Sequence, residues 1–205
     1  DPDKLFVERD IFYLKEETDT QSGGRMVIVL PKQNLSGAQE DSVEFRKWLM
    51  QKVQITAIVD LPREAFQPHT GTKTSLVFLR KVKVIPDSYP IFMAVSEAVG
   101  HDRRGNPLYK KDSNGMSLLD DNKNPVIWND LPEILEQWNY YSLTQNIKPQ
   151  EEGDSHVPSC FVIDSRQILS DPSWRIDAWY WDPNKNNLAK QIEESIGEDI
   201  QEIVR

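Results

Sequence analysis

The residues best suited to chemistry lie in one loop, 61–73, with the sequence LPREAFQPHTGTK. Its proline and glycine residues predict a chain that turns sharply at the surface. Phe66 offers a planar face on which a flat ring could stack, and Arg63, His69 and Lys73 could approach phosphate groups. Alternatively, the loop is a plain surface crossover with Phe66 packed under the sheet edge, because apolar loop residues commonly pack inwards.

Metal-ligating and nucleophilic side chains form no comparable pattern. His156 and Cys160 are four residues apart and His101 is distant, whereas a structural zinc site needs close-spaced ligands, usually four. Asp120 and Asp121 lack the spacing and the glycine of a calcium loop. Cys160 lies in VPSCFVI, which is typical of a strand entering a core rather than of an activated nucleophile. We therefore expect neither a metal site nor a catalytic residue in this chain.

Two apolar segments that are typical of buried strands frame the loop, one at 53–59 and one at 74–82. Upstream, residues 5–17 and 39–52 predict helices, and the unbroken apolar run 26–30 predicts a strand buried on both faces. The order helix, strand, helix, strand predicts parallel strands joined by right-handed crossovers. Because only a loop precedes the last strand, we expect that strand to run antiparallel at the edge of the sheet.

The pattern after these strands is mixed. Residues 90–95 predict a further strand, and residues 131–141 predict a short helix. Between them, Gly105 and Asn114–Gly115 predict the turns of a hairpin, and no internal repeat is recognised. Two more elements are predicted, a strand at 160–163 and a helix at 187–196.

The net charge of −9 is unevenly distributed over the 205 residues. Residues 1–85 carry 13 Lys and Arg against 12 Asp and Glu, whereas residues 86–205 carry 11 against 21. By charge alone the second part is a poor nucleic-acid binder, but the first part could hold a local basic patch. We therefore divide the chain into two parts at residue 85.

The chain has no apolar run near the ~20 residues that cross a bilayer, and its acidic first residues do not form a signal peptide. One cysteine fits a reducing compartment, so we expect a cytoplasmic protein without membrane contact. The first residue is not Met and a helical pattern begins almost at once, which suggests a piece of a longer protein.

Several short motifs resemble those of the N6-adenine DNA methyltransferases, especially the modification subunit of type I restriction systems. They are GGRMVIVLP at 23–31, a strand ending at Leu61-Pro62, Phe66 shortly after it, and Thr70-Gly71 with Thr74 before the last strand. Weaker similarity continues through FMAVSEAVGHDRRGNP and WNDLPEILEQW. SWRIDAWYWDP resembles a segment that leads towards a target-recognition region in fused modification–specificity proteins.

This resemblance implies an α/β fold, a partial Rossmann-like methyltransferase sheet of parallel strands with an antiparallel edge strand, followed by a mixed α+β extension. Such enzymes extrude an adenine from the duplex and methylate its exocyclic nitrogen with S-adenosylmethionine. By the resemblance, Phe66 stacks on the extruded base. The candidates for contacts to DNA are Arg63, His69, Thr70 and Lys73.

Two family motifs are absent, the Gly-rich cofactor loop and the Asn-Pro-Pro-Tyr/Phe tetrapeptide that grips the target amine. In the family both precede the matching region. The resemblance therefore implies that residues 1–85 are the C-terminal half of a methyltransferase domain and that residues 86–205 are an extension towards a target-recognition or partner-docking region. Alone, the chain would bind no S-adenosylmethionine and catalyse nothing. Its partners would be DNA and either specificity and restriction subunits or a fused target-recognition domain.

A function of another class stays open, a non-catalytic interaction or scaffold module of a restriction or phage-defence complex. In that case the aromatic residues Trp179, Tyr180 and Trp181 would anchor a partner, because aromatic side chains concentrate at interface hot spots. The same three residues could instead fold back onto the core of the chain.

Overall fold

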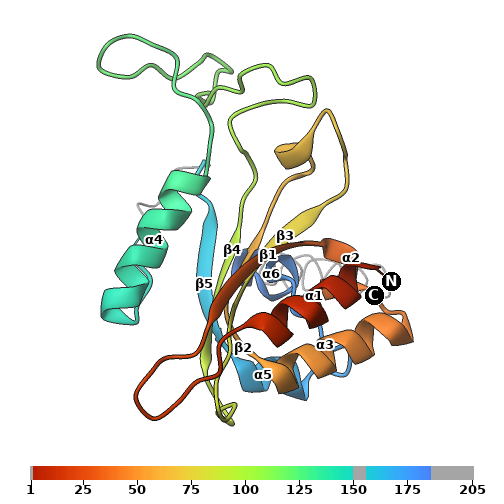
Figure 1. The fold of residues 1–205 in the computed structure, drawn as a ribbon. Helices are drawn as coiled ribbons and strands as arrows, with labels where there is room; N and C mark the ends of the chain where they lie inside the picture. Colours follow the sequence, from red (N-terminus) through yellow and green to blue (C-terminus); the bar gives the residue numbers. More distant parts are fainter. Residues whose placement is uncertain (1, 150–155, 186–205) are drawn as a thin grey trace, which may run out of the picture.

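The computed structural model describes residues 2–149 and 156–185, which are built around one five-stranded mixed sheet (Figure 1). Its strands are β1 (Arg25–Pro31), β2 (Gln54–Asp60), β3 (Thr74–Arg80), β4 (Pro90–Val95) and β5 (Ser159–Asp164). They lie in the order β1-β3-β2-β4-β5. β2 and β4 are parallel neighbours, whereas β3 and β5 run antiparallel to the strands beside them. The predicted α/β class with a mixed sheet is thus confirmed.

The position of β3 differs from the prediction. β3 runs antiparallel as expected, but it lies between β1 and β2 and pairs with both, so the edge position predicted for residues 74–82 is wrong. β3 turns back along β2, and Val77 and Leu79 are buried on one of its faces, which suits an interior strand. β1 and β2 therefore point the same way without being neighbours.

Helices cover both faces of the sheet. They are α1 (Pro2–Tyr13), α2 (Lys32–Ser36), α3 (Glu40–Lys52), α4 (Leu131–Thr144), α5 (Ser165–Ser170), α6 (Ala178–Trp181) and the 3-10 helix η1 (Arg63–Phe66). α1, α3, α5 and α6 contribute to the larger apolar core on one face. α4 packs on the other face, where the rings of Trp138 and Phe92 lie 5.4 Å apart (Figure 1). No helix in the described part is long and apolar enough to span a membrane.

The boundary expected near residue 85 falls in the loop between β3 and β4, and the strands on both sides of it belong to one sheet. The eight longer elements predicted within the described residues are all found, with ends shifted by up to four residues. The prediction that the strand at 26–30 is buried on both faces is wrong, because Val27 and Val29 of β1 are exposed on one face. The predicted helix at 187–196 lies outside the described residues.

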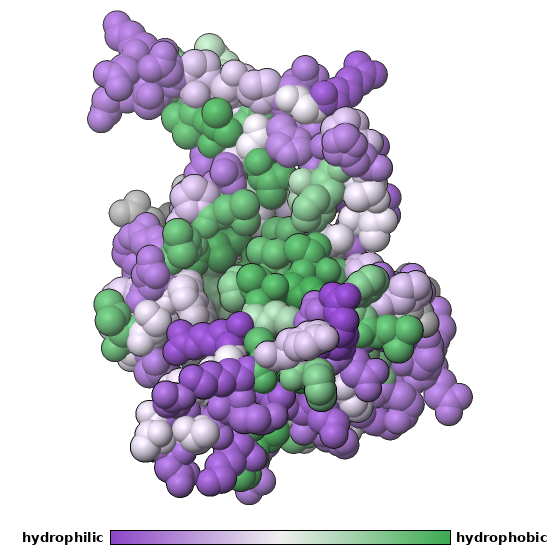
Figure 2. Space-filling model, viewed as in Figure 1, coloured by the Kyte–Doolittle hydropathy of each residue, from purple (hydrophilic) through white to green (hydrophobic). Residues whose placement is uncertain are grey.

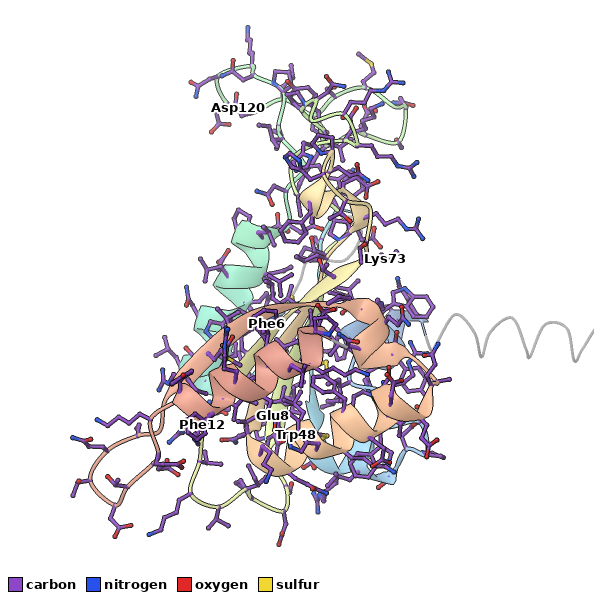
Figure 3. All side chains as sticks on the ribbon, turned by 45° about the vertical axis from the view of Figure 1, so that its right-hand side comes forward. Phe6, Glu8, Phe12, Trp48, Lys73 and Asp120 are labelled. Carbon is purple, nitrogen blue, oxygen red and sulfur yellow. The ribbon has the colours of Figure 1, made fainter. Side chains whose placement is uncertain are left out.

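Residues 100–128 form three hairpins that project beyond the sheet (Figure 1; Asp120 is labelled in Figure 3). Each turn begins at an aspartate, Asp102, Asp112 or Asp120, whose Oδ1 accepts hydrogen bonds from the backbone N–H groups two and four residues later. The residue three places after each aspartate has a positive φ, and these residues are Gly105, Gly115 and Lys123. The segment is therefore an internal repeat, which the sequence did not reveal. In the third copy Lys123 takes the position that glycine has in the other two, so the copies look unlike one another in sequence.

Candidate functional site

The loop between β2 and β3 is closed at its base. Leu61 N donates to Thr74 O over 3.0 Å, and Ser75 Oγ donates to the Asp60 carboxylate over 2.6 Å. These bonds fix both ends of the loop and therefore the position of η1 between them. Phe66, the last residue of η1, is 40% exposed, so its ring is not buried under the sheet.

Within the loop, hydrogen bonds hold the chain that follows Phe66. The backbone N–H groups of His69 and Thr70 both donate to Phe66 O over 3.1 Å. Thr70 Oγ1 in turn accepts a bond from Thr72 N over 3.2 Å. His69 and Thr70 are exposed and line neither of the hollows described next.

Arg63 and Lys73 come together at the base of the loop. With Lys32, the first residue of α2, they line two adjoining hollows of about 320 and 450 Å³ (Lys73 is labelled in Figure 3). Neither Arg63 nor Lys73 forms an ion pair with another described residue. Of the four predicted DNA-contact candidates, the structure therefore groups two at the carboxyl-terminal edge of the sheet.

Asp60 joins three distant segments at this edge. Its carboxylate is buried and accepts hydrogen bonds from Lys32 Nζ (2.8 Å) and from the backbone N–H of Trp179 (3.0 Å). Lys32 Nζ also lies 3.4 Å from the Asp177 carboxylate. Neither Lys32 nor Asp60 is among the site residues predicted from the sequence. A signal for both was available in the sequence, since each closely follows a predicted strand, and strand ends of one direction share one edge of an α/β sheet.

The three aromatic residues around α6 differ in their surroundings. Trp181 packs against the core and its Nε1 donates to Arg175 O over 2.9 Å. Tyr180 donates from its hydroxyl to Asp171 over 2.8 Å. Trp179 stays 46% exposed, and the nitrogen Nζ of Lys32 lies 5.4 Å from its ring centroid. Two of the three predicted anchors thus fold back onto the chain and one does not.

The hollow beside Trp179 also contains Lys185, whose Nζ lies 5.0 Å from the same ring centroid. Lys185 is also absent from the predicted site residues, because no local pattern in the sequence marks it as a neighbour of the loop after β2. The segment that carries these residues is positioned by the buried Arg46, which donates to Ser173 O and Trp174 O over 2.8 Å each.

The described residues include no group of three or more His, Cys, Asp or Glu side chains that could hold a metal ion. Burial, with smaller contributions from Asp130 and Glu133, raises the pKa of the Cys160 thiol to about 12. The thiol therefore stays protonated near neutral pH and is a poor nucleophile. His156 packs edge-on against Trp128, with ring centroids 4.8 Å apart.

Comparison with known proteins gives one family match. Residues 8–128, more than half of the chain, match the family model described as N-6 DNA Methylase. No curated protein matches the chain.

Among solved structures, a chain from work on complex assembly and conformational transition of the type I R-M system has a TM-score of 0.54 at 16% identity. The match covers 98% of this chain and 39% of that one. A modification subunit of a putative type I restriction enzyme from Vibrio vulnificus YJ016 gives 0.49 at 18% identity, covering 85% of this chain and 30% of that one. The type I restriction enzyme EcoKI M protein gives 0.48 at 15%, covering 98% and 42%.

At this level of identity the likeness to the first of these structures shows a shared fold. The chain spans about two fifths or less of the length of the three solved structures.

Proposed function

The chain belongs to the N-6 DNA methylase family, and from this premise we propose that it is part of a site-specific adenine-N6 methyltransferase of a restriction–modification system. The complete enzyme transfers a methyl group from S-adenosylmethionine to an adenine extruded from duplex DNA in the cytoplasm. The observation that carries the proposal is the exposed ring of Phe66, held on a fixed loop inside the matched residues 8–128.

Phe66 would replace the stacking that an extruded base loses. Extrusion costs a few kcal/mol, and one base–aromatic stack restores about 1–3 kcal/mol of that cost. Arg63 and Lys73, exposed and without ion pairs among the described residues, would contact the phosphates on either side of the base. His69 and Thr70, on the same loop, would add further contacts to the DNA.

The methyl donor does not fit the residues present. In α/β folds a dinucleotide or similar cofactor is held where a glycine-rich turn after a strand opens a helix. Among the described strands, β1 leads through Pro31 directly into α2, and β2 leads through Leu61 and Pro62 into η1. We therefore assign the S-adenosylmethionine site, and the groups that hold the target amine, to a part of the methyltransferase outside this chain.

An open apolar area supports the division of the methyltransferase domain. β1 lies at the edge of the described sheet, and its Val27 and Val29 are 54% and 43% exposed. Beside them, an apolar groove of about 330 Å³ runs between Phe78 of β3 and Trp138 of α4 (Figure 2). Large apolar patches and open sheet edges are usually covered in the working protein. We propose that residues 1–85 are the C-terminal half of the domain and that the other half covers this area.

The partners follow from the same proposal. They are DNA and either specificity and restriction subunits or a fused target-recognition domain, towards which residues 86–205 extend.

The test is to express the chain with its upstream coding segment in cells that lack adenine methylation and to map N6-methyladenine in their DNA. We expect methylation at one sequence motif, strongly reduced by Phe66→Ala and retained by Phe66→Tyr, which keeps the ring. Tyr140→Ala, which removes an exposed ring from α4, is the matched control. A full methylation pattern with Phe66→Ala would refute the stacking role. No methylation by the unmodified protein would refute the enzyme and favour the non-catalytic module.

A further inference from the structure

An aromatic residue far along the chain lies at the same edge as the loop of Phe66. We propose that Trp179 is a second stacking residue for DNA, which holds a base near the extruded adenine while Lys185, Lys73 and Arg63 contact the phosphates. This inference rests on the proposed function and adds to it a DNA contact from the C-terminal part of the chain.

The main chain at Trp179 is fixed although its side chain is not buried. Its N–H donates to the buried Asp60 carboxylate over 3.0 Å. Two residues earlier, the fully buried Asp177 receives two hydrogen bonds from the Arg175 guanidinium, each of 2.8 Å. Tryptophan is usually buried to a large extent in folded proteins. Trp179 is 46% exposed although its main chain is held in place, so its ring is accessible to a ligand and is not needed to fill the core.

The charges around Trp179 favour an anion. The hollow of about 320 Å³ that it lines includes Lys32, whose charge the carboxylates of Asp60 and Asp177 offset. The other three cations of the lining, Arg63, Lys73 and Lys185, form no ion pair with described residues. Of the remaining two carboxylates in the lining, Glu64 pairs with Arg103 and Glu97 has no cationic partner among the described residues. Three free cations thus face one free carboxylate.

The adjoining hollow extends this surface. It shares Lys32, Arg63 and Lys73 with the first, continues past Gly71, and has no acidic residue in its lining among the described residues. A row of cationic side chains, Lys185, Lys73 and Arg63, therefore extends from Trp179 to the loop that carries Phe66. Arg63 is the first residue of η1 and Phe66 is the last, so this row ends within one helical turn of the proposed stacking residue Phe66.

An exposed flat ring beside free cations suits a nucleotide. Proteins that hold single strands combine stacking of bases on aromatic side chains with a positively charged groove that follows the phosphates. A docking site for a protein segment would instead surround the tryptophan with apolar side chains, as at interface hot spots. The hollow also has apolar residues in its lining, Leu61, Pro62 and Val95, but its charged side chains outnumber them. The Nζ atoms of Lys32 and Lys185 lie over the Trp179 ring, so nucleic acid is the better fit.

The test compares two substitutions of similar bulk in the complete protein. Trp179→Leu removes the ring and Trp179→Phe keeps one. Binding is measured by fluorescence anisotropy with a short labelled duplex that carries the methylated motif, over a series of salt concentrations. We expect Trp179→Leu to weaken binding roughly 5- to 150-fold, the loss of one base–aromatic stack, and Trp179→Phe to change it only a few-fold. The slope of log K against log salt should stay unchanged in both variants, since no charge is removed.

Lys73→Ala is the electrostatic comparison. Loss of one phosphate contact should lower the magnitude of that salt slope by about 0.9 on duplex DNA. Tyr140→Ala, on α4, should change neither quantity. Thermal unfolding of each variant, compared with that of the unmodified protein, separates loss of the ring from loss of the fold.

The failures are distinguishable. If the unmodified protein methylates and binds DNA and Trp179→Leu binds equally well, the second stacking site is refuted and the proposed function stands. Unchanged DNA affinity with loss of a co-purifying specificity subunit would refute it in favour of a protein anchor at Trp179. If the unmodified protein neither methylates nor binds the duplex, the proposed function fails and this inference fails with it.

Discussion

At the scale of single residues, Arg46 determines where the C-terminal segment lies. Its guanidinium is fully buried and donates to the carbonyl oxygens of Asn34, Gly37, Ser173 and Trp174. Burial lowers the pKa of this group, and the Asp177 carboxylate opposes that shift. The planar fork of arginine matches several carbonyls at once, which the ammonium of lysine cannot do. Through these bonds Arg46 sets the position of α6 and of Trp179.

We expect Arg46→Ala to lower the free energy of unfolding by about 3 kcal/mol or more, because it leaves buried carbonyl groups without donors. Arg46→Lys should recover only part of the loss. Denaturant unfolding measures both. Arg9→Ala, which removes an exposed side chain paired with Asp10, is the control and should cost no more than about 0.5 kcal/mol. Equal stabilities of the Arg46 and Arg9 variants would contradict this account.

Cys160 gives a prediction about pH. With a pKa of about 12 in the folded protein and about 8.5 in an unfolded chain, the thiol keeps its proton in the folded state over a range where the unfolded chain has lost it. The folded state then binds more protons, so the free energy of unfolding should fall as pH rises through that range, and Cys160→Ala should lack this component. Iodoacetamide should label the native thiol far more slowly than the denatured one at pH near 8. Equal labelling rates would contradict the shift.

At the scale of elements, the sequence predicts the long segments and misses the short ones. Helices and strands with a full apolar period were located to within a few residues, because the period itself marks the buried side. α2, η1 and α6 have five residues or fewer, which is too short for any period to show. The interior position of β3 in the sheet could not be predicted from the sequence either, because it depends on pairing with β1, more than forty residues away.

The site residues likewise fall into those that the local sequence predicts and those that it does not. Phe66, Arg63 and Lys73 belong to one loop and were found by local composition and resemblance. Trp179 is held at that site by long-range contacts, among them the hydrogen bond to Asp60, 119 residues earlier, so no local pattern could place it there. From the sequence alone, Trp179 is predicted only as a possible anchor for a partner.

The exposed edge strand provides a test of the divided domain. If the other half of the domain covers β1, Val29→Asp would bury an unpaired charge in the complete protein and lower the free energy of unfolding by about 3 kcal/mol. The same substitution at Val84, which is 75% exposed in the loop after β3, should cost about 0.5 kcal/mol or less. Denaturant unfolding of both variants measures the difference. A cost at Val29 no greater than at Val84 would show that the face stays open.

At the scale of the whole molecule, net charge is a poor guide to the edge for which we propose DNA contact. The chain carries −9 overall, and most of the excess acid lies in residues 86–205. Several of those carboxylates accept hydrogen bonds from other groups of the chain. Asp102, Asp112 and Asp120 accept bonds from the backbone of the projecting hairpins, and Asp177 is buried against Arg175. Free cations remain at one edge, where the two proposed stacking rings also lie.

The most direct measurement is methyl transfer from S-adenosylmethionine to duplex DNA by the complete protein, compared between the unmodified form, Phe66→Ala and Phe66→Tyr. Phe66 is exposed, so Phe66→Ala should leave the fold intact while removing one stack on the extruded adenine. We expect kcat/KM to fall roughly 5- to 150-fold with Phe66→Ala and only a few-fold with Phe66→Tyr. A value for Phe66→Ala equal to that of the unmodified protein would contradict the account.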